Sequence, residues 1–224
     1  MPMTHFIEFH DVCKFYTMGE NRIAAADHIS FYVDEGEFCV IVGPSGAGKT
    51  TVLNMLGGMD TCDEGEILLD GNKISEYNQK QLTTYRRYDV GFVFQFYNLV
   101  QNLTALENVE LASEICKDPL DARDTLVEVG LGERLKNFPA QLSGGEQQRV
   151  AIARALGMDT KILLADEPTG NLDTANGENI FSILQGLAHE SGYCVVLVTH
   201  DQGLAERADR VLELRDGVAV GERG

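Results

Sequence analysis

Gly43-Pro44-Ser45-Gly46-Ala47-Gly48-Lys49-Thr50 decides the fold, because this stretch matches the phosphate-loop pattern G-x-x-x-x-G-K-[ST]. The preceding residues, Phe38-Cys39-Val40-Ile41-Val42, are apolar and rich in β-branched side chains, which is typical of a buried strand. Residues 51–56 can continue as a helix, which the pair Gly57-Gly58 ends. The sequence therefore predicts the strand, loop and helix that a phosphate-binding loop requires.

Each part of this loop has a role at a nucleotide's phosphates. Its glycines let backbone N–H groups turn inward around phosphate oxygens, and the N-terminus of the helix that follows adds a partial positive charge. Lys49 is expected to neutralise the β- and γ-phosphates, and the Thr50 hydroxyl to hold Mg²⁺. The alternative is a flexible glycine-rich turn, which the flanking strand and helix disfavour. We expect every residue from Gly43 to Thr51 to bind ATP.

Two further apolar runs end in polar residues. Residues 162–165 lead into Asp166 and Glu167. Asp166 is expected to hold Mg²⁺, while Glu167, on the other side of an extended backbone, would act on the attacking water as general base or orienting group. Residues 194–198 lead into Thr199-His200-Asp201, which brings His200 to the same sheet edge as a γ-phosphate contact. The plain alternatives are a solvated acidic pair and an ordinary loop histidine.

A second glycine turn follows at Leu142-Ser143-Gly144-Gly145-Glu146. Ser143 and Glu146 form a capping-box pattern that opens an amphipathic helix, and capping alone explains those two residues. The two glycines are not needed for capping, and they free N–H groups at a positive helix end for an anion. Because the phosphate loop already encloses one face of a nucleotide, we expect this second site to contact ATP held by another copy of the chain.

In this order, the motifs resemble those of nucleotide-binding subunits of ATP-binding cassette (ABC) transporters, and the likeness covers essentially the whole chain. Leu142 to Glu146 looks like the signature of that family. The resemblance implies that Gln95 contacts magnesium and reports the nucleotide state to a membrane subunit, that Tyr16 stacks on adenine, and that Asp173 crosses a dimer interface. Taken singly, these three have plain alternatives: a polar loop residue, a strand-end core aromatic and a helix N-cap.

Three stretches look like the lipoprotein-release and macrolide-export group of that family: Thr17-Met18-Gly19-Glu20, Arg86-Arg87 and residues 98–109. The resemblance implies a membrane permease with a large extracytoplasmic domain, and ATP hydrolysis coupled to transport or mechanical work. A non-transporting member that signals through its membrane partner to cell-wall or cell-division machinery is the alternative. The chain departs from many relatives in having Glu146 where they have glutamine, and in a shorter segment 111–142.

Composition limits the partners. The formal net charge is −17, which repels nucleic acid and anionic lipid. No apolar run is long enough to span a bilayer and no N-terminal segment resembles a secretory signal, so we expect a cytoplasmic protein held at the inner face of the plasma membrane by its permease. The five cysteines show no C-x-x-C or metal spacing, which favours reduced thiols: Cys13, Cys39, Cys62, Cys116 and Cys194.

The expected fold class is α/β, a P-loop NTPase (RecA-like) parallel core with an N-terminal antiparallel β subdomain and an inserted α-helical subdomain. Strands are predicted at residues 6–12, 29–33 and 66–70 for the antiparallel part. The helical subdomain is predicted at about residues 96–154, with helices opened by the Thr104-Ala105-Leu106-Glu107 capping box and at residues 120–129. A hairpin is expected around Asp216-Gly217. Residues 1–224 are expected to form a single ABC ATPase domain.

The mechanism expected from these motifs needs two copies. ATP binds with its adenine on Tyr16 and its phosphates in the loop, and a homodimer closes so that Ser143 and Gly145 of one copy cover the γ-phosphate bound by the other. Glu167 then activates water while Lys49 and His200 stabilise the developing charge.

Overall fold

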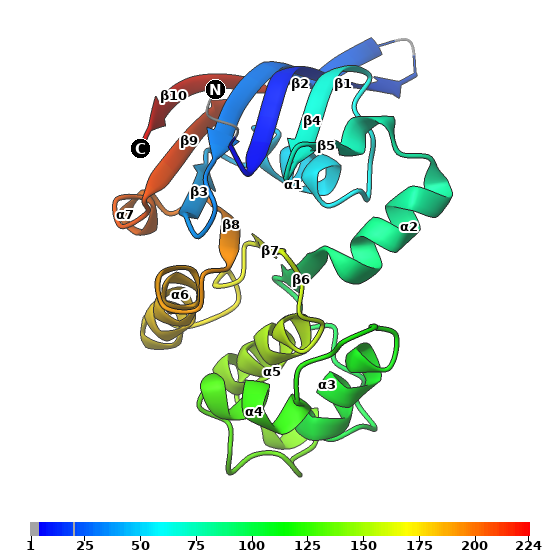
Figure 1. Ribbon diagram of the computed structural model, residues 1–224. Coiled ribbons are helices and arrows are strands. Elements are labelled where there is room, and N and C mark those ends of the chain that lie inside the picture. Colours follow the sequence, from blue (N-terminus) through cyan, green and yellow to red (C-terminus); the bar gives the residue numbers. More distant parts are fainter. Residues whose placement is uncertain (1–4, 20) are drawn as a thin grey trace.

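The computed structural model describes residues 5–19 and 21–224, which form two β-sheets with helix α1 (Lys49–Leu56) between them and further helices on the other face of the second sheet (Figure 1). The first sheet has the order β2-β1-β4-β5 and all its pairings are antiparallel. Its strands are β1 Ile7–Met18, β2 Asn21–Val33, β4 Glu64–Leu69 and β5 Asn72–Lys73. The predicted antiparallel subdomain is confirmed, although β1 and β2 are much longer than predicted. One residue of the resemblance quoted above, Glu20, lies outside the described residues.

The second sheet has the order β10-β9-β3-β8-β7-β6. Its strands are β3 Phe38–Val42, β6 Val90–Phe94, β7 Ile162–Asp166, β8 Cys194–Thr199, β9 Arg210–Arg215 and β10 Val218–Arg223. All neighbours are parallel except β9 and β10, which form the predicted hairpin. Asp216 and Gly217 both have positive φ, 50° and 80°, which is the geometry of a tight two-residue hairpin turn.

Both faces of the parallel sheet are buried, as strand β3 illustrates. All five of its residues are inaccessible to solvent. Phe38, Val40 and Val42 belong to the hydrophobic core on the helical side, whereas Cys39 and Ile41 belong to the core shared with the antiparallel sheet. This alternation follows from the two-residue period of a strand, and an apolar residue at every position is what burial on both faces requires.

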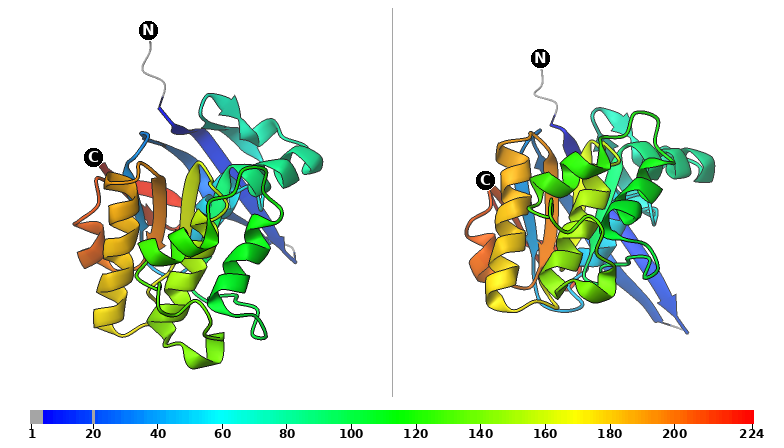
Figure 2. Two further views of the ribbon diagram at one scale, coloured as in Figure 1. Left: turned by 60° about the horizontal axis from the view of Figure 1, so that its bottom comes forward. Right: turned by 90° about the horizontal axis from the view of Figure 1, so that it is seen from below.

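The helices of the described chain are distributed over its whole length after β3. They are α1 Lys49–Leu56, α2 Gln79–Tyr88, α3 Ala105–Ser113, α4 Ala122–Glu128, α5 Gly144–Leu156, α6 Thr174–His189 and α7 Gln202–Ala205, with short 3₁₀ turns η1 Ile74–Glu76 and η2 Pro139–Gln141. Helices α5 and α6 pack on the parallel sheet, α5 against β6 and α6 against β3 and β8 (Figure 2). Within the described ranges, none of these helices combines the length and the apolar character needed to cross a bilayer.

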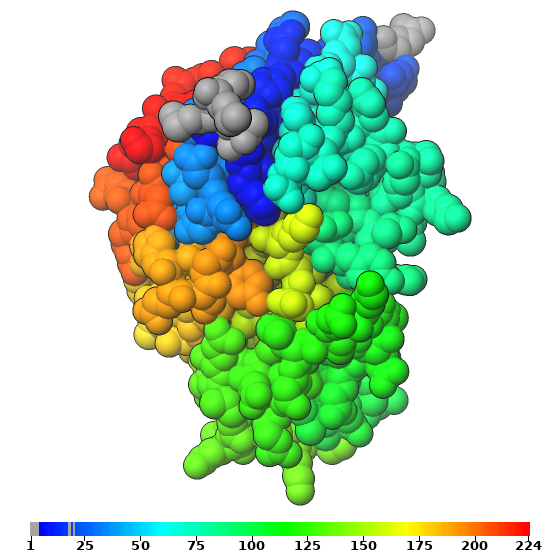
Figure 3. Space-filling view, in the orientation of Figure 1, coloured from blue at the N-terminus to red at the C-terminus, as the bar shows by residue number. Residues whose placement is uncertain are grey.

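Helices α3, α4 and α5 form a lobe at the end of the molecule away from the antiparallel sheet (Figure 3). The sequence signals for two of them are realised as capping boxes. Thr104 accepts the N–H of Glu107, whose carboxylate accepts the N–H of Thr104, and Ser143 and Glu146 do the same at the start of α5. Asp121 caps α4, which lies inside the segment 120–129 predicted as helical.

Candidate functional site

A cleft of about 850 Å³ opens where the carboxyl ends of β3, β7 and β8 meet. The pairing of Val42 with Thr199 and of Asp166 with Val198 brings these strand ends level with one another. The lining residues are Tyr16, Ala25, Pro44, Ser45, Gly46, Ala47, Gly48, Lys49, Thr50, Thr51, Gln95, Glu167, Gly170 and His200. Residues predicted from five separate parts of the chain thus meet in one cavity, at the sheet edge where α/β folds bind ligands.

The phosphate loop leads into the start of α1, where backbone N–H groups are available as hydrogen-bond donors. The helix begins after Gly48, which has φ 96° and gives no side-chain cap, so the N–H groups of the first turn are free for an anion. A Cβ atom at Gly48 would lie 2.2 Å from the carbonyl oxygen of Ala25 on β2. Only glycine fits both the left-handed backbone and this close approach.

The Lys49 ammonium is held by the loop itself. Its Nζ donates to the carbonyl oxygens of Gly43 at 2.8 Å and Pro44 at 3.0 Å, and lies 3.8 Å from Oε1 of Glu167. The side chain is nearly buried, so its charge is delivered to the cleft with little screening by water. Gly43 contributes through this carbonyl and is not itself among the residues that line the cleft.

Thr50 and Asp166 lie together as predicted. The Thr50 hydroxyl donates to Oδ1 of Asp166 at 3.2 Å. Burial raises the pKa of Asp166, and the neighbouring Glu167 charge acts in the same direction, while the Thr50 hydrogen bond and the Lys49 charge oppose it. A divalent cation would relieve this cost, and hydroxyl and carboxylate oxygens are the donors that Mg²⁺ prefers. The residues present therefore fit both a nucleotide's phosphates and Mg²⁺.

Glu167 reaches the cleft by a route that the sequence argument did not foresee. We expected an extended backbone to send its side chain away from Asp166, but Glu167 has φ 46°, in the left-handed region. Its N–H donates to the carbonyl of Val198 at 2.9 Å, and Oε2 lies 2.9 Å from Nδ1 of His200. The turn after β7, rather than strand alternation, separates the two carboxylates.

Tyr16 lies at one wall of the cleft. The alternative interpretation, an aromatic residue buried in the core at a strand end, is therefore wrong. Its side chain is 39% exposed. The hydroxyl donates to Oδ2 of Asp60 at 2.6 Å, and Lys14 donates to the other carboxylate oxygen at 2.7 Å. Burial and the Asp60 hydrogen bond raise the pKa of Tyr16. Asp60, which the sequence analysis did not single out, thus fixes the orientation of the ring.

Gln95 follows β6 and also faces the cleft. Its Nε2 donates to Oδ1 of Asn171 at 3.3 Å, and Asn171 donates back to the Gln95 carbonyl at 3.1 Å. A Cβ atom at Gly170 would lie 2.8 Å from Gln95 Nε2, so the segment after β7 packs closely on this side chain. Gly170 and Ala25 are lining residues that the sequence analysis missed. The turn signal Pro168-Thr169-Gly170 pointed to the first, and no signal pointed to the second.

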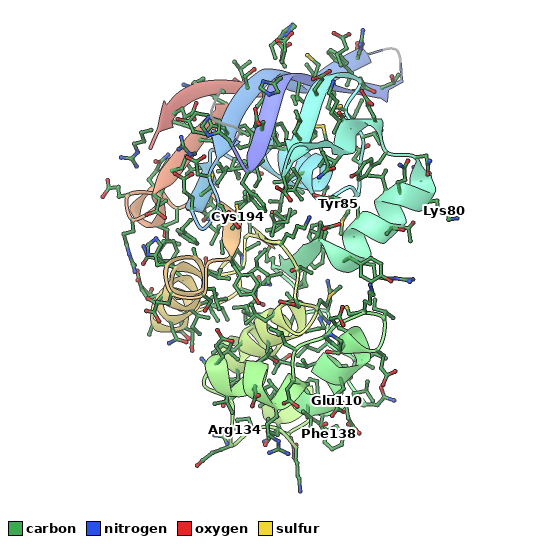
Figure 4. The ribbon with its side chains drawn as sticks, viewed as in Figure 1. Lys80, Tyr85, Glu110, Arg134, Phe138 and Cys194 are labelled. Carbon is green, nitrogen blue, oxygen red and sulfur yellow. The ribbon has the colours of Figure 1, made fainter. Side chains whose placement is uncertain are left out.

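The signature segment lies elsewhere. In the described part of the chain, the cleft lining includes neither Ser143, Gly144, Gly145 and Glu146 nor Asp173. Glu146 accepts the N–H of Ser143 at 2.8 Å, which is the main reason its pKa is lowered, and it pairs with Arg134 at 3.0 Å. Figure 4 shows Arg134 at the end of the molecule away from the antiparallel sheet.

Asp173 is the N-cap of α6, which was the alternative to a role at a dimer interface. Its carboxylate accepts the N–H of Asn176 at 3.0 Å and the Asn176 side-chain amide at 2.6 Å, and these hydrogen bonds lower its pKa. A role at an interface between copies stays a prediction.

Comparison with known proteins decides the family. A family model described as ABC transporter matches residues 26–170, well over half of the chain. The chain belongs to the ABC transporter family. It is therefore an ATP-binding cassette of the ATPase type, as the resemblance implied.

This cassette has similar relatives over nearly its whole length. It is 46% identical over 221 residues to an uncharacterised ABC transporter ATP-binding protein of Methanocaldococcus jannaschii, covering 96% of this chain and 97% of that one. It is 42% identical to the lipoprotein-releasing system ATP-binding protein LolD of Shewanella frigidimarina, covering 95% and 91%. It is 43% identical to the macrolide export ATP-binding/permease protein MacB of Hyphomonas neptunium, covering 97% of this cassette and 34% of MacB. These relatives confirm the lipoprotein-release and macrolide-export group.

Among solved structures, the dimeric bacterial ABC transporter cassette MJ0796 superimposes with a TM-score of 0.86 at 43% identity, covering 97% of both chains. The same protein has also been solved as a dimer in a post-hydrolysis state with ADP and phosphate. The cassette fold and its ATPase class are thus established for the present chain by close similarity.

Proposed function

We propose that this cassette works as a homodimer in which each ATP is bound by the phosphate loop of one copy and covered by the signature segment of the other. The observation that carries the proposal is the separation of two anion-binding surfaces within one chain. The cleft holds the phosphate loop, whereas the start of α5 belongs to the helical lobe and lines no part of that cleft among the described residues. A second copy provides a use for the second surface.

The start of α5 is suited to an anion even though its glycines also serve packing. A Cβ atom at Gly144 would lie 2.7 Å from the Tyr97 hydroxyl, and one at Gly145 would lie 2.5 Å from Oδ1 of Asn176. The Ser143 hydroxyl accepts the N–H of Glu146, and among the described residues the N–H groups of Gly144 and Gly145 have no acceptor, so they are available at the positive end of the helix. Close packing therefore holds this end rigid without using its donors.

The residues of the cleft support hydrolysis of the bound ATP. Glu167 accepts a proton from water as the water oxygen bonds to the γ-phosphorus, and the bond to the bridging oxygen breaks to release ADP. His200, 2.9 Å from Glu167, orients this carboxylate, and Lys49 offsets negative charge on the phosphates. Bound Mg²⁺, held by Thr50, Asp166 and Gln95, would supply further neutralisation of phosphate charge.

The remaining partner is a membrane permease. The relatives LolD and MacB are named for lipoprotein release and macrolide export, and MacB combines an ATP-binding part with a permease. These names favour transport over the signalling alternative. A net charge of −17 disfavours direct contact with anionic lipid or nucleic acid. We infer that the cassette lies at the cytoplasmic face of the plasma membrane, on a permease with a large extracytoplasmic domain.

The Glu167→Gln variant tests this function. It keeps a side chain of the same size that cannot accept the proton, so turnover should fall by about 10²-fold or more while ATP still binds. With ATP and Mg²⁺, light scattering should show a stable dimer, because closure is not followed by hydrolysis. Glu178→Gln, on the exposed side of α6, is the matched control and should behave as the wild type. Normal turnover by Glu167→Gln would show that Glu167 is not the base.

A further inference from the structure

The pairing of β1 with β2 contains two residues in an uncommon conformation. Asp11 and His28 each have φ 52°, and the register between the strands shifts repeatedly between Phe9 and Phe15. Left-handed backbone at residues other than glycine is costly, and bulges of this kind redirect side chains. Here they turn side chains from two strands toward one point.

The side chain of His28 is held in one orientation. Its Nδ1 lies 2.7 Å from Oδ1 of Asp11, so Nδ1 donates to this carboxylate and Nε2 is the nitrogen that can bind a metal. This Nε2 lies 3.8 Å from Oδ1 of Asp27. A histidine that hydrogen-bonds a carboxylate with one nitrogen and offers the other is the usual arrangement at a metal centre.

Cys13 completes the group. Its sulfur accepts the backbone N–H of His28 at 3.3 Å, and the residue is fully buried. Ligand atoms of Cys13, Asp27 and His28 all lie within 4.8 Å of one another. Bonds of about 2.0–2.3 Å to a tetrahedral zinc ion place ligand atoms roughly 3.5 Å apart, so small side-chain movements would close the site.

We propose that Cys13, Asp27 and His28 bind a Zn²⁺ ion, with Asp11 orienting the imidazole and water in the fourth position. A thiolate, an imidazole and a carboxylate together select zinc over magnesium or calcium, which prefer oxygen ligands alone. None of these four residues lines the nucleotide cleft, so the site is separate from the one for ATP.

The site is nevertheless joined to the phosphate loop through the backbone. The N–H of Asp27 donates to the carbonyl of Gly217 at 2.8 Å, and the N–H of Gly217 donates to the carbonyl of Ala47 at 3.1 Å. Ala25, two residues before Asp27, lines the cleft. A bound ion would therefore cross-link the bulges of β1 and β2 where these strands support the phosphate loop.

Cobalt binding to the chelator-treated full chain tests the site. Co²⁺ should bind at one equivalent with a thiolate-to-metal charge-transfer band, and Zn²⁺ should displace it. Cys13→Ser should abolish the band, and Asp11→Asn should weaken binding about 10–100-fold, as expected for a residue that orients a ligand. The controls Cys116→Ser and His10→Asn should bind as the wild type does.

Two further variants keep the test decisive. His28→Asn and Asp27→Asn change residues that are not fully buried, so folding should survive, and each should weaken Co²⁺ binding by at least tenfold. Asp166→Asn removes the carboxylate that would hold Mg²⁺ at the nucleotide cleft and should leave the charge-transfer band unchanged. The proposal fails if no band appears, if the band persists in Cys13→Ser, or if His28→Asn binds as tightly as the wild type.

Discussion

The Nδ1 atom of His200 lies 2.9 Å from Oε2 of Glu167, and this hydrogen bond joins the ends of the neighbouring strands β7 and β8 in the lining of the nucleotide cleft. Glu167 itself sits on a left-handed backbone with its side chain largely shielded from solvent, whereas the His200 ring is mostly exposed. The carboxylate therefore depends on the imidazole for its orientation, and the imidazole is free to contact a ligand through its other nitrogen.

Replacing His200 with alanine should slow hydrolysis without removing the nucleotide. Glu167 would lose its orienting partner and the γ-phosphate a contact, so kcat should fall about 10²-fold while the Kd for ATP changes by less than about threefold. Steady-state ATPase assays and nucleotide titration measure the two quantities. His189→Ala is the control, because its ring pairs with Asp209 at 2.7 Å outside the cleft. An unchanged kcat in His200→Ala would remove this residue from the mechanism.

Asp166 should make the nucleotide-free protein less stable as the pH rises. Burial raises its pKa in the folded state, so the folded protein holds this proton more tightly than the unfolded chain. Below the ordinary pKa of 3.8, both states are protonated and the effect is absent; it grows as the pH rises and is complete above the folded pKa.

Asp166→Asn removes this titration. The free energy of unfolding of the variant, relative to that of the wild type, should therefore increase as the pH rises from the ordinary pKa of 3.8 through the raised pKa of the folded state. Urea unfolding without Mg²⁺ or nucleotide measures the difference. A relative stability that is constant over this range, or that falls as the pH rises, would contradict the burial argument.

The ring of Tyr16 should contribute to ATP affinity through stacking. Loss of an aromatic ring from a base costs about 1–3 kcal/mol, so Tyr16→Ala should weaken ATP binding about tenfold or more. Tyr16→Phe keeps the ring and loses only the hydrogen bond to Asp60, so its affinity should stay within about threefold of the wild type. Fluorescent-nucleotide titration distinguishes the two variants. Equal affinities for Tyr16→Ala and the wild type would place adenine elsewhere.

Sequence patterns predicted the core and the cleft because apolar runs and glycine turns have local causes. The buried strand before Gly43 and the capping box at Ser143 are both specified by a few consecutive residues. The length of β2 was not predictable in this way. Its first three residues, Asn21 to Ile23, are exposed, and two of them are polar, so they show no apolar pattern. Helix α2 was also missed, although Asn78 and Gln81 form a capping box that the sequence displays.

Other features depend on backbone geometry that no pattern reveals. The left-handed backbone at Glu167 decides where that carboxylate points, and it is accompanied by a hydrogen bond from the Glu167 N–H to the carbonyl of Val198 on the neighbouring strand. The same is true of Asp11 and His28, whose bulges bring Cys13 into a cluster although the cysteine spacing shows no metal motif. Long-range pairing thus sets these positions.

The claim that two copies share each nucleotide site is tested most directly by one measurement. This is the mass, with ATP and Mg²⁺, of the double variant that combines Ser143→Arg with Glu167→Gln. The arginine would block the start of α5 without touching the cleft of its own chain. The account predicts that the double variant binds ATP within about threefold of Glu167→Gln alone, yet keeps the mass of one chain in light scattering. A dimer of the double variant, or loss of ATP binding by its isolated chain, would contradict a site completed by the second copy.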